Sequence, residues 1–319
     1  MASGNESIPI DDDYADGSDD SVSNLSIAST IYQYRLENGR RYHAYRDGQY
    51  WAPNDQQARS SEMVSHHAFL ITLNDKLLLA PVRNPRRALD VGCGIGTWTL
   101  DFAEAYPNTA VVGTDLSPIQ PETIPPNLHF EIDDCCSDWV YPRDHFDYIH
   151  VRQLYGSVAD WPKFYRECYD HLAPGGYIEQ AEVNPAPKSD DGSIARGDPF
   201  DECGKLAVHA GNAFGKSLMV EEFMHEEIVR AGFADVVRVR FKWPIGGWSN
   251  DPRLKELGKW VLVHWNEGLE GWVLRFFTKH MGWTFEGVKQ WNADMRRVLK
   301  DRKYHAYQDV SIVYARKPL

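Results

Sequence analysis

The chain has 319 residues, of which 43% are hydrophobic and 13% aromatic, so it can bury the core of one large domain or of two. Its net charge of −12 argues against a duplex nucleic acid as the main partner, because phosphate binding depends on clustered Lys and Arg. No window is apolar over the roughly 18 to 20 residues of a membrane span, and the N-terminus lacks the basic and apolar regions of a secretory signal.

The five cysteines are few and odd in number, which is typical of reduced thiols inside a cell. The adjacent pair Cys135 and Cys136 does not have the spacing of a zinc site, and we predict no metal centre. These observations indicate an intracellular protein without a membrane span and without a direct nucleic-acid partner.

Residues 1–30 carry seven acidic residues before the first basic residue, Arg35, and little apolar content. We expect a disordered acidic tail, which is either a solvated segment or a docking motif. Residues 31–85 then begin with a dense aromatic stretch that must pack on the body. Helical spacing follows over residues 60–79, with Met63, His67, Leu70, Ile71 and Leu78 on one predicted face.

A short apolar strand over residues 88–91 runs into glycines at alternate positions, Gly92, Gly94 and Gly96, with Cys93 between the first two. Glycines allow a sharp turn and a close approach to a ligand, and Asp115 ends the next apolar strand, where an acid can accept both ribose hydroxyls. A dinucleotide fingerprint would need its third glycine at Thr97. G-x-G-x-G is instead typical of S-adenosyl-L-methionine (SAM) methyltransferases, although an incidental glycine turn would leave the same pattern.

The remaining cofactor contacts are predicted from the ends of neighbouring strands. Leu116 is the expected apolar wall against adenine, and Asp134 with Cys135 is expected to bind the adenine edge, since Asp133 would point to the opposite face. A turn-forming Asp pair is the alternative. Val151 and Arg152 would reach the rim near the methionine part of SAM, unless Arg152 only forms a structural ion pair.

Strands and helices alternate along the rest of the chain, which predicts a parallel sheet in an α/β fold. Helices are expected over residues 97–105, 162–172 and 220–231, and seven strands over residues 88–91, 110–114, 128–132, 146–151, 177–183, 236–243 and 310–315. We divide the chain into the tail (1–30), an N-terminal lid and helix (31–85), a SAM-binding Rossmann-like core (86–183), and the rest of the core with an inserted cap (184–319). The cap contains six tryptophans, and it is either a lid above the cofactor, a satellite core, or both.

No catalytic base stands out. His150, Tyr155, Glu179, Glu182 and His209 lie on segments that can border the pocket, but a core or surface role suits each of them better, and a base must lie within hydrogen-bond reach of its proton. The sequence therefore predicts no catalytic residue.

Several motifs together resemble the LaeA-like methyltransferases of filamentous fungi, including the velvet-associated members. The similarity covers residues 32–318 and rests on residues 38–45 (NGRRYHAY), 53–55 (PND), the paired His66 and His67, the glycine motif, 172–176 (LAPGG), 243–248 (WPIGGW), 251–256 (DPRLKE) and the C-terminal residues 305–318. The resemblance implies a class I methyltransferase sheet in the order 3-2-1-4-5-7-6 with the last strand antiparallel. It also implies that Tyr42 and its neighbours fold over the cofactor as a lid.

The resemblance further implies a role in fungal secondary metabolism and its regulation, in the nucleus or the cytoplasm, with possible velvet-type protein partners. The first reading is therefore a SAM-dependent methyltransferase that acts on a protein side chain or a small metabolite and releases S-adenosyl-L-homocysteine (SAH). The second is a regulatory scaffold that binds SAM with little or no turnover. The glycine motif and Asp115 favour cofactor binding in both.

Overall fold

The computed structural model describes residues 32–319. The acidic segment 1–30, for which we predict disorder, lies outside the described residues. None of the helices between residues 32 and 319 combines the length and the hydropathy that a bilayer crossing requires.

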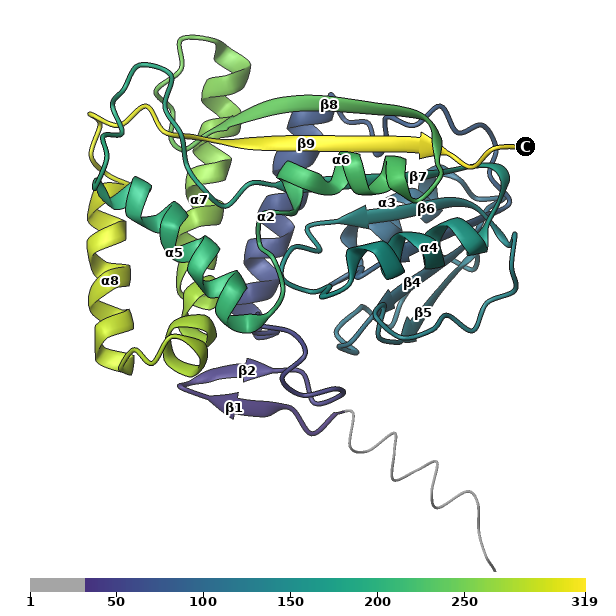
Figure 1. Ribbon diagram of the computed structural model, residues 1–319, viewed down its shortest axis with the longest axis horizontal. Helices are drawn as coiled ribbons and strands as arrows, with labels where there is room; N and C mark the ends of the chain where they lie inside the picture. The colour runs from purple at the N-terminus through teal and green to yellow at the C-terminus, as the bar shows by residue number, and fades with distance from the viewer. Residues whose placement is uncertain (1–31) are drawn as a thin grey trace, which may run out of the picture.

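A seven-stranded sheet forms the centre of the molecule (Figure 1). Its spatial order is β5-β4-β3-β6-β7-β9-β8, which is 3-2-1-4-5-7-6 when the strands are numbered within the sheet, and β9 runs antiparallel to both of its neighbours. The predicted fold class is therefore confirmed. The strands are β3 (Arg87–Val91), β4 (Ala110–Asp115), β5 (Leu128–Ile132), β6 (Phe146–Arg152), β7 (Leu172–Val183), β8 (Ala234–Pro244) and β9 (Tyr307–Arg316).

Helices cover both faces of the sheet, as the buried, largely apolar central strands require. On one face α4 (Trp161–His171) and α6 (Val220–Arg230) pack together over β7 and β9 through a core that includes Trp161, Phe164 and Met224. On the other face lie α2 (Gln56–Leu73), α3 (Thr97–Ala105) and α7 (Pro252–Arg275).

Helix α2 differs from its prediction in both its end and its buried face. It ends at Leu73 because Asn74 (φ 54°) and Asp75 (φ 60°) adopt left-handed backbone conformations that stop the helix. Met63 is 56% exposed and His67 is exposed. The buried residues of α2 are instead small, polar and aromatic ones that contact α3, α7 and the sheet, namely Ser61, Ser65, His66, Ala68, Phe69, Thr72 and Leu73.

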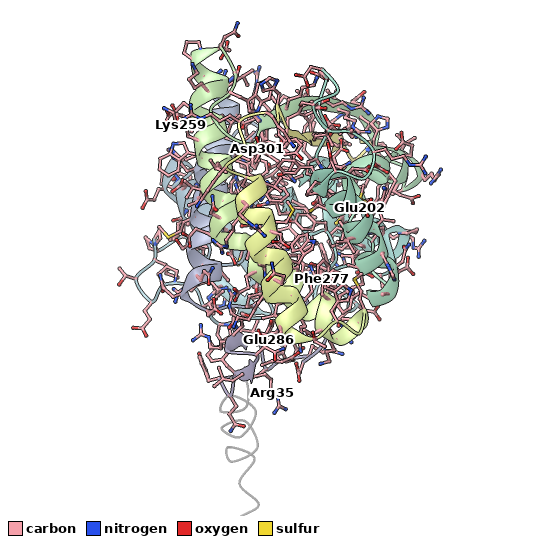
Figure 2. All side chains as sticks on the ribbon, turned by 90° about the vertical axis from the view of Figure 1, so that its left-hand side faces the viewer. Arg35, Glu202, Lys259, Phe277, Glu286 and Asp301 are labelled. Carbon is pink, nitrogen blue, oxygen red and sulfur yellow. The ribbon has the colours of Figure 1, made fainter. Side chains whose placement is uncertain are left out.

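Two further parts complete the molecule. A hairpin of β1 (Arg35–Glu37) and β2 (Arg40–Tyr42) precedes α2 and was not predicted as strands. The inserted segments form a helical cap of α5 (Pro199–Phe214), α7, η1 (Phe276–His280) and α8 (Phe285–Val298), which packs at one side of the sheet. Figure 2 looks onto this cap, with α8 and α7 beside α5.

Candidate functional site

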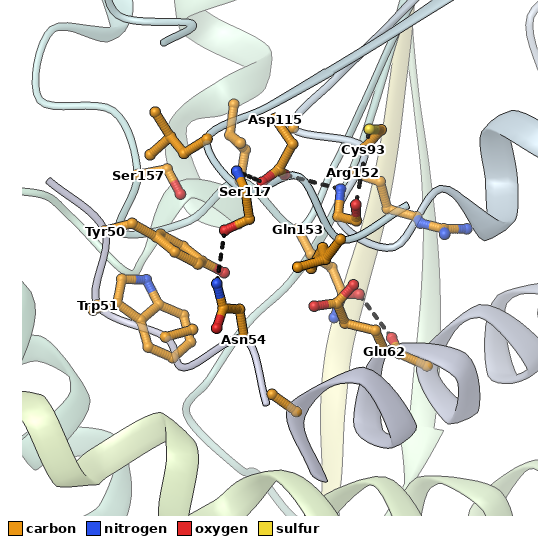
Figure 3. Close-up of a pocket in the computed structure, with 18 of the residues that line it drawn as sticks. Tyr50, Trp51, Asn54, Glu62, Cys93, Asp115, Ser117, Arg152, Gln153 and Ser157 are labelled. Carbon is orange, nitrogen blue, oxygen red and sulfur yellow. Dashed lines mark hydrogen bonds between the residues drawn. The ribbon is translucent and has the colours of Figure 1, made fainter. Parts of the chain in front are cut away.

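A cavity opens at the carboxyl ends of β3, β4 and β6, where the loops of the parallel strands meet α2, α7 and the segment before α2. Figure 3 shows residues from these separate parts of the chain around one space, with Asp115 and Ser117 facing Asn54 and Glu62. Ligands of open α/β sheets bind in this position because the strand ends leave a crevice there.

The glycine loop and Asp115 are joined directly. The Asp115 carboxylate accepts the backbone N–H of Gly94 (2.9 Å) through one oxygen and that of Ser117 (2.9 Å) through the other. Gly94 has a φ of 57°, a conformation that suits glycine, and a Cβ there would collide with the Glu62 side chain. Burial raises the pKa of Asp115 to about 6 despite the two N–H donors.

Glu62 of α2 places a second carboxylate over the same loop. Its Oε2 accepts the backbone N–H of Ile95 at 3.0 Å. Burial raises the pKa of Glu62 to about 7, and the nearby negative charge of Asp115 adds to that effect. A helix residue with no motif around it gave no sequence signal, so this residue was missed.

The segment before α2 covers the cavity from the side of the hairpin. Trp51 is buried and donates its Nε1–H to the carbonyl of Tyr155 (3.3 Å), and Asn54 donates to the hydroxyl of Ser117 (3.1 Å). The start of the helix is fixed because Asp55 accepts the N–H of Ala58 as its N-cap. The aromatic stretch and the 53–55 motif were the available sequence signals for this wall.

Eight of the predicted cofactor residues line the cavity, and three do not. The lining residues are Gly92, Cys93, Gly94, Asp115, Leu116, Asp134, Cys135 and Arg152. Their contact with a cofactor stays a prediction, since position alone does not establish binding.

Tyr42, Gly96 and Val151 lie away from the cavity wall. Tyr42 is fully buried, with its ring under the guanidinium of Arg275 at 4.5 Å. Gly96 caps the N-terminus of α3 and packs against Phe130. Val151 is fully buried in the core because successive strand residues point to opposite faces.

The two acids after β5 behave differently from the prediction. Asp133 lines the cavity together with Asp134, because the strand ends at Ile132 and alternation does not continue into the turn. Asp134 accepts the N–H of Cys136 at 3.0 Å, so it also forms the turn that we considered as the alternative. The donor atoms of Asp134, Cys135 and Cys136 lie within 4.8 Å of one another, as expected for consecutive residues in such a turn.

Arg152 and His150, at the end of β6, also line this cavity. The guanidinium of Arg152 lies over the ring of Phe69 at 5.0 Å, and burial lowers its pKa to about 10. His150 binds Asp90 at 2.8 Å and stacks on Trp98 at 3.5 Å, so its ring is held in the core as well as bordering the cavity.

The other candidate bases have mainly structural positions. Glu179 accepts the N–H groups of Leu79 and Ala80, and His209 is exposed. Glu182 accepts the N–H of Leu154, while Tyr155 does line the cavity.

A second, mostly apolar cavity adjoins the first beneath the helical cap. Five residues border both cavities: Trp51, Gln153, Tyr155, His264 and Trp272. His264 was missed because it lies in the middle of α7, where a lone histidine between apolar residues carries no motif.

The chain matches a protein family described as a methyltransferase domain over residues 65–235. It is 38% identical over 299 residues to a methyltransferase named pytC from Aspergillus terreus, with 92% of this chain and 91% of the relative covered. It is 35% identical to the secondary metabolism regulator laeA of Aspergillus fumigatus, with 96% and 83% covered. A protein-methionine methyltransferase laeA from Emericella nidulans is 32% identical, with 90% and 77% covered.

Solved structures show the same fold. A phosphoethanolamine N-methyltransferase of Haemonchus contortus, in complex with S-adenosyl-L-methionine, matches with a TM-score of 0.51 at 16% identity. The match covers 93% of this chain and 74% of that one. At this identity the similarity extends to the fold alone.

Proposed function

The chain belongs to the methyltransferase family that includes the fungal LaeA-type proteins, and on this basis we propose that its larger cavity binds SAM and releases SAH. The observation that carries the proposal is the position of Asp115, whose carboxylate closes the glycine loop at the end of β4. When bound, SAM supplies a methyl group activated by a positively charged sulfur.

The residues that line the larger cavity fit SAM. SAM carries a sulfonium and an ammonium cation, and the cavity wall contains the carboxylates of Glu62, Asp90, Asp115, Asp133 and Asp134. A Cβ on Gly92 would lie 2.6 Å from a Leu154 methyl group, so glycine keeps this point of the loop free of a side chain and open to a ligand.

Each predicted residue then has a role in the proposal. Gly92, Cys93 and Gly94 would pass under the amino-acid part, with the N-terminus of α3 behind Gly96 favouring its carboxylate. Asp115 would accept the ribose hydroxyls, and Leu116, Asp134 and Cys135 would surround adenine. Glu62 and Arg152 would set the charge around the methionine part.

Replacement of Asp115 tests the site. We expect Asp115→Ala to weaken SAH binding at least tenfold, because charge-assisted hydrogen bonds contribute roughly 1.5 to 3 kcal/mol. Titration calorimetry measures this change. The matched control is Asp138→Ala, since the Asp138 side chain is 87% exposed outside the cavity and its loss should leave the affinity within about twofold. Unchanged SAH affinity in Asp115→Ala would remove this residue from the site.

The biological role follows from the relatives. The names of pytC and laeA support a role for this chain in fungal secondary metabolism, with a protein side chain or a small metabolite as methyl acceptor. Incubation of the protein with radiolabelled SAM and a fractionated fungal extract distinguishes a protein acceptor, a small-molecule acceptor and a scaffold without turnover. Label in the protein pool or in the small-molecule pool supports turnover, whereas tight SAH binding with label in neither pool supports the scaffold.

We further propose that the protein works in the nucleus, the cytoplasm or both, and that velvet-type proteins are its regulatory partners, as the resemblance to the LaeA-like methyltransferases implies. Microscopy of a fluorescent fusion, and co-purification with such partners from the fungus, test this proposal. Retention of the fusion at a membrane or outside the cell would contradict it.

A further inference from the structure

The second cavity is a chamber under the helical cap, with about 710 Å³ of space between its walls, part of it continuous with solvent. Its walls come from α5, α7, η1 and α8, together with the ends of β7 and β9. Figure 2 shows these helices side by side, with Phe277 labelled between them. Most of the lining side chains are themselves buried, among them Cys203, Ala210, Trp265, Leu269, Phe276 and Phe277.

Polarity is distributed unevenly along the chamber. Gln153, Tyr155 and His264 stand at the neck, where the chamber meets the proposed SAM cavity. Beyond the neck the lining holds the indole N–H of Trp291 and one amide side chain, Gln308, which is already satisfied. It accepts the indole N–H of Trp265 (2.8 Å) and donates to the carbonyl of Asn184 (2.8 Å). An occupant therefore meets most of the hydrogen-bonding groups at one end.

His264 presents a free ring nitrogen at this neck. Its Nδ1 lies 3.0 Å from both the carbonyl oxygen and the hydroxyl oxygen of Ser61. The carbonyl can only accept and the hydroxyl can also accept, so we assign the proton to Nδ1 and the lone pair to Nε2. Within residues 32–319, Nε2 has no hydrogen-bond partner. Burial lowers the pKa of His264 to about 4, so the ring is neutral at physiological pH.

A peptide segment fits this chamber poorly. Its backbone would bring several N–H and C=O groups into a space whose inner walls offer few partners, and each unpaired group costs about 1 to 3 kcal/mol. A flat apolar molecule instead gains from contact with Trp51, Trp272 and Phe276, and its one polar group can remain at the neck.

We propose that the chamber binds the methyl acceptor, and that the acceptor is a small apolar molecule with one hydroxyl group directed at His264 Nε2. This inference rests on the proposed SAM site. In the transfer, the acceptor oxygen bonds to the methyl carbon while the carbon–sulfur bond breaks and its electron pair stays on sulfur. The hydroxyl proton passes to Nε2, so the positive charge moves from sulfur to the imidazolium, which later releases the proton to water.

Naphthol is a suitable probe, because it is flat, apolar and carries one hydroxyl. We expect it to bind the SAH-loaded protein in titration calorimetry, and Ala207→Phe to weaken that binding at least tenfold by filling the chamber from α5. The matched control is Val208→Phe, which adds the same ring one residue along α5 at a side chain that is 41% exposed, and should change the affinity less than twofold. Ala207→Leu replaces the larger variant if that variant does not bind SAH.

The outcomes of this experiment are separable. If SAH itself fails to bind the wild-type protein, the proposed function fails. If SAH binds but naphthol does not, or if naphthol binds equally well to Ala207→Phe, the chamber is not an acceptor site. Transfer of labelled methyl to proteins of a fungal extract, with none in organic-soluble compounds, would also overturn the proposal.

His264→Asn tests the hydroxyl contact separately. The asparagine amide can still donate to the Ser61 carbonyl, but it lacks the second nitrogen. We expect labelled methyl transfer to naphthol to slow at least a hundredfold, while SAH affinity stays within about threefold of wild type. An unchanged transfer rate would remove His264 from the reaction.

Discussion

The ionised form of Glu62 destabilises the folded protein when no ligand is bound. Burial and the neighbouring Asp115 both raise its pKa, which is about 7 in the folded protein. At pH 8 the folded state therefore holds two half-buried negative charges that repel each other. We expect Glu62→Gln to raise the free energy of unfolding at pH 8 by about 1 to 2 kcal/mol, because its amide oxygen can still accept the N–H of Ile95. Urea denaturation at pH 8 measures this change.

Glu104→Gln is the matched control for that variant. Glu104 is exposed on α3, and removal of its charge should alter stability by less than about 0.5 kcal/mol. A Glu62→Gln variant that is less stable than wild type at pH 8 would show that the charge of Glu62 stabilises the loop instead.

At the scale of elements, the β1–β2 hairpin depends on one buried side chain at the end of α7. Arg275 is 2% exposed and donates to the carbonyl of Tyr50 (3.0 Å) and to Asp47 (3.0 Å), while its guanidinium covers Tyr42. We expect Arg275→Ala to lower the free energy of unfolding by about 2 to 4 kcal/mol, since it leaves these groups without their partner. It should also weaken SAH binding and expose the hairpin to trypsin, because the segment from Tyr50 to Asn54 covers the cavity.

Lys279→Ala is the control for Arg275→Ala, because it removes an exposed positive charge near the hairpin instead of a buried one. Lys279 also reaches the hairpin, at 4.0 Å from Glu37, but its side chain is 48% exposed. Such exposed pairs contribute little, so the stability and the trypsin sensitivity should stay near wild type. Equal effects of the two substitutions would mean that α7 does not anchor the hairpin through Arg275.

The same elements show what local sequence can and cannot predict. The sheet strands were predictable because buried parallel strands read as apolar runs with turn residues between them. The buried face of α2 was not, because it is determined by the strand β8 and the helices that pack against it. Trp243 donates to Thr72 and packs edge-on against Phe69, contacts between residues about 170 positions apart. Periodicity alone placed exposed Met63 on that face.

For the molecule as a whole, one part of the site was predictable from a local motif and another part was not. The glycine loop and Asp115 were predictable because one short motif carries both the turn and the acid. Glu62 and His264 come from two helices that meet only in the folded protein, so no local pattern marks them, whereas Asn54 lies in the 53–55 motif. The chamber under the cap is likewise formed by parts that are far apart in the sequence, namely α5, α7 with η1, α8 and the ends of β7 and β9.

The shifted pKa values of several carboxylates and histidines make the free energy of unfolding depend on pH. Burial raises the pKa values of Glu62, Glu179 and Glu182 to about 7 and that of Asp115 to about 6. The folded state therefore holds these protons more tightly than the unfolded chain, and stability falls as pH rises until the carboxylates have ionised. Buried histidines act in the opposite direction. Burial lowers the pKa values of His43, His66, His150 and His264, so their contribution rises with pH and is complete slightly above the unfolded value of about 6.5.

Above pH 6.5 the carboxylates thus dominate the balance. We expect the free energy of unfolding of the ligand-free protein to decrease by about 1 to 3 kcal/mol between pH 6.5 and pH 8, in urea denaturation at constant ionic strength. Glu62→Gln should flatten part of this decrease, because it removes one of the groups that lose a proton in that interval, whereas Glu104→Gln should reproduce the wild-type profile. A wild-type stability that is constant or rises over the same interval would mean that the buried carboxylates are already ionised in the folded state at pH 6.5, and that the cavity is charged before its ligand arrives.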